Sequence, residues 1–170
     1  MVSIEEFWRR PLKNGSISST IVSSDALYNN TTGYNNTGIG HGALQSSTTG
    51  YENVAVGANA LTSNTIGVYN TAVGTRALYN SDIASANTAF GYQAGYTITS
   101  GGGNTLIGRE AGYTLNNGYR NTILGGYAGY NLTGDDNVLI GFKAGYSETG
   151  SNKLYISSYD VDNSAERNLI

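Results

Sequence analysis

Short alternations of polar and apolar residues recur every 17 residues along most of the chain, each beginning with Asn and ending with Gly. In every copy an Ala follows three residues after that Gly. A degenerate copy begins near Ser19, and a half copy at residues 152–157 closes the series. Self-similarity at a short fixed period predicts stacked repeats, each contacting mainly its neighbours. The Asn residues that mark the period are Asn36, Asn53, Asn70, Asn87, Asn104, Asn121 and, after a step of 16, Asn137.

Each repeat has the composition of one coil of a β-solenoid. The five residues from Asn to Gly, such as 121–125, are rich in β-branched and apolar types between turn formers, which predicts a strand. The segment after the Gly, such as 92–96, predicts a second short strand with its repeated Ala in a tight interior position. Ser, Thr, Asn and Gly fill the remainder and predict turns. The sequence therefore predicts an all-β, parallel β-solenoid of about eight 17-residue coils over residues 19–157.

Both faces of the predicted strand are apolar. Side chains alternate between the faces of a strand, so Thr105 and Ile107 share one column, which we expect to face the core. The other column would then leave an apolar stripe in water, which is typical of an interaction surface. A thin core and such a stripe predict obligate association of several chains by closed cyclic symmetry. The expected stripe is Gly38, Ala55, Ala72, Ala89, Leu106, Ile123, Leu139 and Tyr155.

The strand motifs resemble a known family. NTAVG at 70–74, NTAFG at 87–91 and NTLIG at 104–108, each followed by x-x-Ala, resemble the head repeats of trimeric autotransporter adhesins and related repeats of phage tail fibres. The resemblance implies a left-handed parallel β-roll, a homotrimer about a common axis, and a head that binds host or matrix surfaces. It also implies an extracellular place, on a cell surface or a virion. The 17-residue coils and the NT-x-x-G strands are closer to the fibre-like group.

Composition narrows the partners. Charged residues are 12% of the chain and the net charge is −3, with no basic stripe, so we expect no nucleic-acid binding. No stretch approaches the roughly 20 apolar residues of a spanning helix, so we expect no direct membrane insertion. Cysteine is absent, which excludes disulfide and thiolate chemistry.

Catalytic chemistry has little support. His41 is the only histidine and lies at a position that varies between repeats, which disfavours a Ser-His-Asp arrangement. The Gly-rich runs lack the Gly-Lys-Ser/Thr of a phosphate loop. Asp135–Asp136 and the Asp160/Asp162 pair match no full calcium-loop signature, so we interpret them as solvated turn carboxylates. We expect no enzyme activity, no cofactor and no metal site.

Tyrosine supplies the candidate binding residues. One column predicts an aromatic ladder, which could stack on sugar rings or on another protein, or could simply cover the edge of the coils. Tyr28 occupies the same column in the first, degenerate copy. The ladder consists of Tyr79, Tyr96, Tyr113, Tyr130 and Tyr146.

Two further columns have structural interpretations. Stacked Asn side chains are expected to hydrogen-bond one another along the rod, as amide ladders do. The Thr residues at 37, 71, 88, 105 and 122 resemble the hydroxyl arrays of ice-binding solenoids, but their expected place on the buried face disfavours ice binding.

The two ends of the chain lie outside the repeat. Residues 1–18 form an expected cap or attachment segment, with a short helix over 4–10 between Ser3 as its N-cap and Pro11. A cap is expected because a bare solenoid end exposes strand edges. Residues 158–170 form a carboxyl-terminal extension, and the tail resembles the segment that precedes the self-cleaving chaperone of tail fibres.

These observations favour a non-enzymatic trimeric adhesin or fibre segment that attaches to a cell surface, through a host glycan or protein. A purely structural spacer of a tail fibre or large surface protein is the first alternative. An ice-binding β-solenoid is the second.

Overall fold

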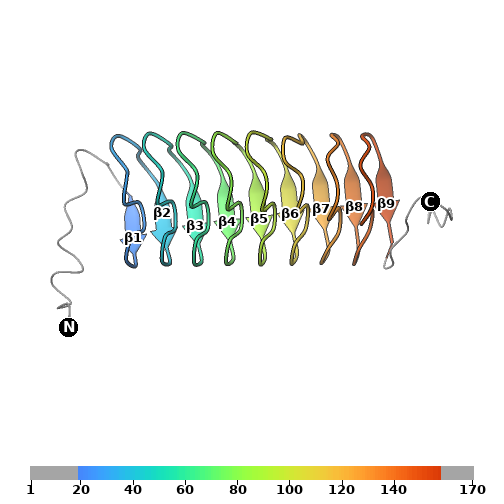
Figure 1. Cartoon of the computed structure of the whole chain (residues 1–170), viewed down its shortest axis with the longest axis horizontal. Helices are drawn as coiled ribbons and strands as arrows, with labels where there is room; N and C mark the ends of the chain where they lie inside the picture. Colours follow the sequence, from blue (N-terminus) through green and yellow to red (C-terminus); the bar gives the residue numbers. More distant parts are fainter. Residues whose placement is uncertain (1–18, 158–170) are drawn as a thin grey trace.

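The computed structural model describes residues 19–157, which form a regular stack of coils (Figure 1). The described strands pair in parallel, in chain order, as one nine-stranded sheet with residues matched at the repeat step, for example Thr88 with Thr105. The predicted all-β parallel β-solenoid is thereby confirmed. The predicted helix and cap within 1–18, the extension at 158–170 and the Asp160/Asp162 pair lie outside the described residues. The strands are β1 (Thr20–Val22), β2 (Thr37–Ile39), β3 (Val54–Val56), β4 (Thr71–Val73), β5 (Thr88–Phe90), β6 (Thr105–Ile107), β7 (Thr122–Leu124), β8 (Val138–Ile140) and β9 (Leu154–Ile156).

Strands β2 to β8 are each followed by the repeated glycine because the chain turns a corner there. Gly91 has φ 141°, a conformation that residues with a Cβ rarely adopt. A Cβ at Gly91 would also lie 2.5 Å from the carbonyl oxygen of Gly108 in the next coil. Backbone conformation and close stacking together therefore favour Gly at this corner, although Ser23 adopts the same conformation, with φ 136°, in the first coil.

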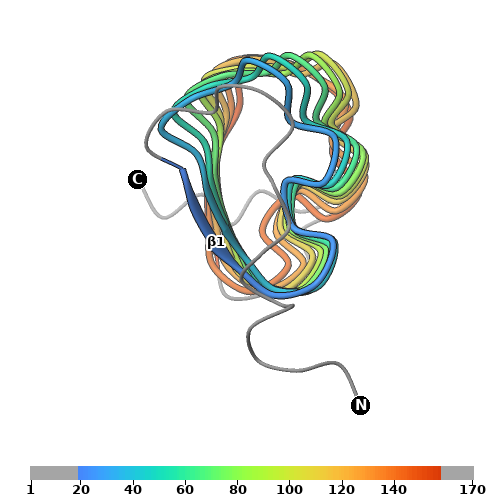
Figure 2. The same cartoon turned by 90° about the vertical axis from the view of Figure 1, so that its left-hand side faces the viewer.

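The predicted second strand is wrong, because that side of the coil is built from turns. Gln93 and Gly95 have φ values of 54° and 63°, which are left-handed and incompatible with an extended strand. Hydrogen bonds between coils persist nonetheless, from the Gly95 N–H to the Ala111 carbonyl at 2.9 Å and from the Thr97 N–H to the Tyr113 carbonyl at 3.1 Å. We call this segment, residues 91–98 and their equivalents, the turn wall. Figure 2 shows the strands on one side of the coil and the turn segments on the other.

The predicted orientation of the strand is also wrong. Its central residue, for example Ala72 or Leu106, is fully buried, whereas the flanking residues point outward. The reason is the width of the coil. The Ala column of the turn wall is buried opposite the sheet, and the narrow space between the walls accepts Gly, Ala, Leu or Ile at the centre of the strand. The sheet therefore presents its Thr and aliphatic columns to solvent, in place of the expected Gly, Ala and Leu stripe.

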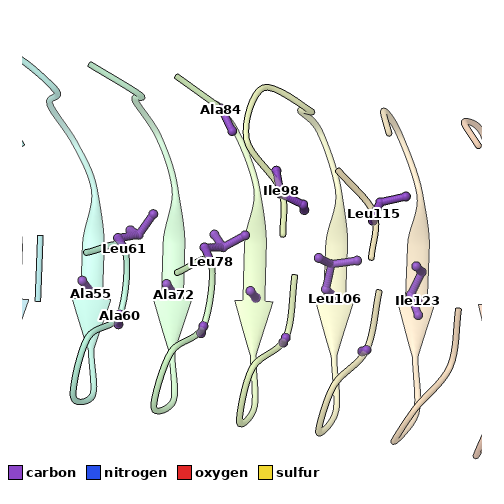
Figure 3. Packing of buried hydrophobic residues seen from close by; sticks show 14 of the residues in the cluster. Ala55, Ala60, Leu61, Ala72, Leu78, Ala84, Ile98, Leu106, Leu115 and Ile123 are labelled. Atoms are coloured by element: carbon purple, nitrogen blue, oxygen red, sulfur yellow. The ribbon is translucent and has the colours of Figure 1, made fainter. Parts of the chain in front are cut away.

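The large core residues take different positions in the two halves of the rod. In the coils of β3 and β4, Leu61 and Leu78 reach in from the turn wall, opposite strand residues that are Ala. In the coils of β6 and β7 the strands supply Leu106 and Ile123, and the turn-wall position is Gly (Figure 3). At Gly112, for instance, a Cβ would lie 3.0 Å from Leu106 Cδ2. A large strand residue thus requires Gly at this one turn-wall position, while Leu115 and Leu132, three residues further along the turn wall, also fill the core of these coils.

The predicted Asn ladder is confirmed. Asn87 is fully buried, and its Nδ2 donates to the Gly101 carbonyl at 2.9 Å and to Asn70 Oδ1 at 3.3 Å. Its Oδ1 accepts hydrogen bonds from the backbone N–H of Asn104 at 3.1 Å and from Asn104 Nδ2 at 2.9 Å. Each amide therefore joins its own coil across the turn and also joins two coils along the rod. This use of both amide atoms satisfies buried polar groups at the start of strands β2 to β8.

A polar pair ends the core at the carboxyl side of the rod. Tyr155 Oη donates a hydrogen bond to Glu148 Oε2 at 2.6 Å, and the N–H groups of Thr149 and Gly150 donate to Glu148 Oε1. Partial burial opposes ionisation of Glu148, but these hydrogen bonds lower its pKa overall. The hydrogen bond to Glu148, together with burial, raises the pKa of Tyr155 to about 12. The pair is therefore held as a carboxylate and a neutral phenol near neutral pH.

Candidate binding surfaces

The tyrosine ladder is formed by five successive coils on the turn wall. Its rings lie parallel, with centroids of neighbouring rings 4.9–5.2 Å apart and interplanar angles of 3–12°. Each side chain is half-buried. The predicted residues Tyr79, Tyr96, Tyr113, Tyr130 and Tyr146 are all present in this stack.

Stacking decides which part of each ring can meet a partner. Tyr96, Tyr113 and Tyr130 each have a parallel ring on both sides, so a sugar ring has no free aromatic face to cover at these positions. What remains for a partner is the outer ring edge and the hydroxyl group. Burial raises the pKa of Tyr113 and Tyr130, with a further contribution from Glu110, so both hydroxyls stay protonated donors near neutral pH. The ladder is therefore suited to hydrogen bonds between its hydroxyl groups and a partner that lies along the rod.

A second group of aromatic and charged side chains adjoins the ladder in the carboxyl-terminal half. The Tyr127 ring lies 6.2 Å from that of Tyr130 and edge-on, at 5.9 Å, to Phe142. The Arg109 guanidinium lies over the rings of Tyr92 and Tyr127, at 5.7 and 5.2 Å from their centroids. These residues occupy two variable columns that follow each corner glycine. The sequence motif did not identify them, because only their stacking in space makes them one surface.

Arg109 is held in place while remaining accessible. Its Nε donates to Glu110 Oε1 at 3.1 Å, and its side chain is 62% exposed. Two coils further along the rod, the Lys143 ammonium lies 5.2 Å from the centroid of the Tyr146 ring. Cation–π contacts of this kind orient the charged groups along the aromatic surface. The cations are thereby presented beside the ladder.

The outer face of the sheet is a second candidate surface. Ile39, Phe90 and Ile107 are 36%, 57% and 42% exposed, although they lie in the strands. They belong to one column that runs the length of the rod, at the last residue of each strand. Contiguous exposed apolar surface on this scale is typical of an interaction site. The full column is Val22, Ile39, Val56, Val73, Phe90, Ile107, Leu124, Ile140 and Ile156.

The Thr column accompanies this apolar column on the outer face. Thr88 is exposed, and Thr37, Thr71, Thr105 and Thr122 are partly exposed. The expectation that these hydroxyls are buried is therefore wrong, because the narrow coil accepts only the central residue of each strand. Their exposure makes the Thr hydroxyls accessible to ice, in contrast to the expectation from the sequence.

A separate aromatic group lies in the amino-terminal half, at the turn before the strands. The Tyr34 and Tyr51 rings stack at 4.9 Å, and the Tyr69 ring meets Tyr51 edge-on at 5.4 Å. A hydrogen bond with Tyr51 raises the pKa of Tyr69 to about 12. The repeat motif does not reveal this group, because its members come from two different columns: Tyr34 and Tyr51 share one, and Tyr69 lies in the next.

The remaining candidate residues have local partners. His41 Nε2 lies 3.6 Å from Asp25 Oδ2 on an exposed surface. Asp135 accepts a hydrogen bond from the Tyr119 N–H at 2.8 Å, and Asp136 forms a two-point ion pair with Arg120 at 2.7 and 2.8 Å. Among residues 19–157 there is no cluster of three potential metal-binding side chains, and no helix with the length and hydropathy to cross a bilayer.

In comparisons with protein-family models, curated proteins and solved structures, the chain matches none. The repeat motif, the tyrosine ladder with its neighbouring cations and the outer face of the sheet are therefore the features from which a function can be inferred.

Proposed function

We propose that this protein is a non-enzymatic rod of a trimeric adhesin or fibre, in which three chains associate through the outer faces of their sheets. The observation that carries the proposal is the exposed aliphatic column of the sheet. Ile, Val and Phe on that face are exposed to water in a single chain, and exposed sheet residues of this kind favour contact with another chain. Threefold packing would bury the same column in every copy, as closed symmetry requires.

The finer features of the assembly are part of the proposal. The left-handed sense of the coils and the threefold symmetry follow from the resemblance to adhesin heads and tail fibres. A helical cap within residues 1–18 would cover the first strand, since an open sheet edge invites pairing with other chains. The same resemblance favours an extracellular rod, on a cell surface or a virion.

Attachment would use the opposite side of each chain. With the sheets at the shared axis, the turn walls and their tyrosine ladders face outward on all three copies. Three parallel ladders would present many weak sites to a host glycan or protein, so that avidity exceeds the affinity of any one site. The geometry of the ladder favours hydrogen bonds to the tyrosine hydroxyls over stacking on the ring faces.

A paired substitution tests the assembly. Ile107→Lys places a charge on the outer sheet face, and we expect it to convert the trimer to a monomer that retains its β-sheet circular dichroism. Ile66→Lys is the matched control, because Ile66 is also exposed but lies in a turn outside the sheet. A wild-type chain that is already monomeric would contradict the proposal. A trimer that binds neither cells nor glycans would identify a purely structural spacer.

Ice binding is a second candidate function, favoured by the outward Thr column. Thr71, Thr88 and Thr105 follow one another at the strand spacing of about 4.8 Å, each beside an aliphatic or aromatic side chain. Ice and a second chain would compete for the same face. A monomer with thermal hysteresis that is lost in Thr88→Lys would support ice binding and argue against the trimer.

A further inference from the structure

Charge is distributed unevenly around the rod. Of the five Lys and Arg residues within 19–157, three lie beside the tyrosine ladder: Arg76, Arg109 and Lys143. Of the seven described carboxylates, Glu110 lies in the same columns as these cations, and Glu148 ends the turn wall of the Lys143 coil, where it accepts a hydrogen bond from Tyr155. Glu52, Asp82, Asp135 and Asp136 lie in the turns that follow the turn wall and precede the strands, and Asp25 lies in the first coil. A chain with a net charge of −3 therefore carries a positive strip along its aromatic side.

The three cations have a regular spacing. Arg76, Arg109 and Lys143 follow β4, β6 and β8, so one cation occurs in every second coil. Two strand spacings of about 4.8 Å place successive charges about 10 Å apart along the rod. The hydroxyls of the tyrosine ladder lie beside them at every coil. The strip thus alternates a charged group with neutral hydrogen-bonding groups.

The spacing of the three cations along the rod fits some classes of polyanion better than others. A nucleic-acid strand carries one phosphate about every 3.4 Å, roughly three times the density of the cations. Its bases would also need free aromatic faces on which to stack, and the inner tyrosine rings have none. A linear polysaccharide with one carboxylate in each disaccharide has a low charge density and many hydroxyls. Its chemistry matches a strip of sparse cations and phenol groups.

We propose that the strip formed by Arg76, Arg109, Lys143 and the tyrosine ladder binds a linear acidic polysaccharide that runs along the rod. The cations pair with its carboxylates, and the tyrosine hydroxyls hydrogen-bond the sugars between them. The cation–π contacts of Arg109 and Lys143 hold the charged groups against the aromatic rings before the ligand arrives, which lowers the entropy cost of binding. The proposal rests on the attachment function above and specifies its ligand class.

The test uses the full chain and hyaluronan, which has one carboxylate per disaccharide, as the probe in calorimetric titration. We expect binding that weakens with added salt, and a loss of about tenfold in affinity for Arg109→Gln/Lys143→Gln. The matched control Arg120→Gln/Lys153→Gln removes the same charge elsewhere and is expected to change affinity less than twofold. Tyr113→Phe, which keeps the stack and removes one hydroxyl, should weaken binding without changing the salt dependence.

Several results would overturn the ligand assignment. Equal losses in the two double variants would indicate general charge attraction. Equal binding to neutral dextran would refute the acidic class, and preference for single-stranded DNA or anionic vesicles would assign the strip to another partner. The mass in solution is measured on the same samples. A trimer that does not bind hyaluronan refutes the ligand assignment alone, whereas a monomer refutes the proposed assembly.

Discussion

The exchange of large residues between the two walls of the core predicts a compensating double substitution. Leu106 is fully buried, and Leu106→Ala should cost about 2–5 kcal/mol through lost contacts and a cavity. Gly112→Leu should also cost about 2–5 kcal/mol, because a side chain there has a left-handed φ, near 61°, and overfills the coil. Coils of the amino-terminal half already combine Ala on the strand with Leu at this turn-wall position, as Ala72 and Leu78 do. The double variant restores that pairing within the coil, and the remaining close neighbour is Ile123 of the next coil, whose Cδ1 lies 3.3 Å from a Cβ at Gly112.

Additivity would give a loss of about 4–10 kcal/mol for the double variant, whereas we expect about 1–3 kcal/mol, chiefly the strain of a left-handed Leu. The existing Leu78, with φ 50°, indicates that the fold tolerates this conformation. Urea unfolding followed by circular dichroism measures the free energies, at one protein concentration because association adds to stability. Strictly additive losses would refute the idea that the two walls fill one shared space.

Two other predictions concern polar contacts. Asn87→Ala should cost about 2–4 kcal/mol, because it leaves the Gly101 carbonyl and the Asn104 N–H buried without their partners. The pair of Glu148 and Tyr155 should make stability depend on pH at both extremes. Glu148 has a lowered pKa, so its contribution is present above its ordinary value of 4.5 and is lost as the pH falls below it. Tyr155 has a raised pKa, so its contribution is present below pH 10 and is lost as the pH rises through about 12.

Controls for these two predictions lie within the chain. Asn80→Ala alters an Asn in the turn wall that is partly exposed, and its unfolding free energy should change by less than about 0.5 kcal/mol. An equal loss for Asn80 and Asn87 would contradict the structural role of the ladder. Glu148→Gln should reduce the acid-side and alkaline-side pH dependence together. An unchanged pH profile would mean that the hydrogen-bonded pair contributes nothing to stability.

The period of the sequence was sufficient to predict the coils, the position of each strand and the Asn ladder. These features depend on residue types that recur at one position, and stacking at a fixed step brings like residues together. Asn87, for example, could be assigned its partners because Asn70 and Asn104 lie one coil away on either side.

The orientation of the strand could not be predicted in the same way, because both of its faces are apolar. The deciding quantity is the gap between the two walls, and that gap depends on the left-handed turns around residues such as Gln93. Those turns also explain why no second strand forms. The surface around Arg109 and Tyr127 was missed because its members occupy variable columns, where a repeat motif carries no information.

The molar mass of the chain in solution tests the central claim most directly. Light scattering coupled to size-exclusion chromatography should give three times the 17.9 kDa of one chain, unchanged in Ile66→Lys and reduced to a single chain in Ile107→Lys. A wild-type mass of 17.9 kDa at micromolar concentration, with the sheet intact, would contradict association through its outer face.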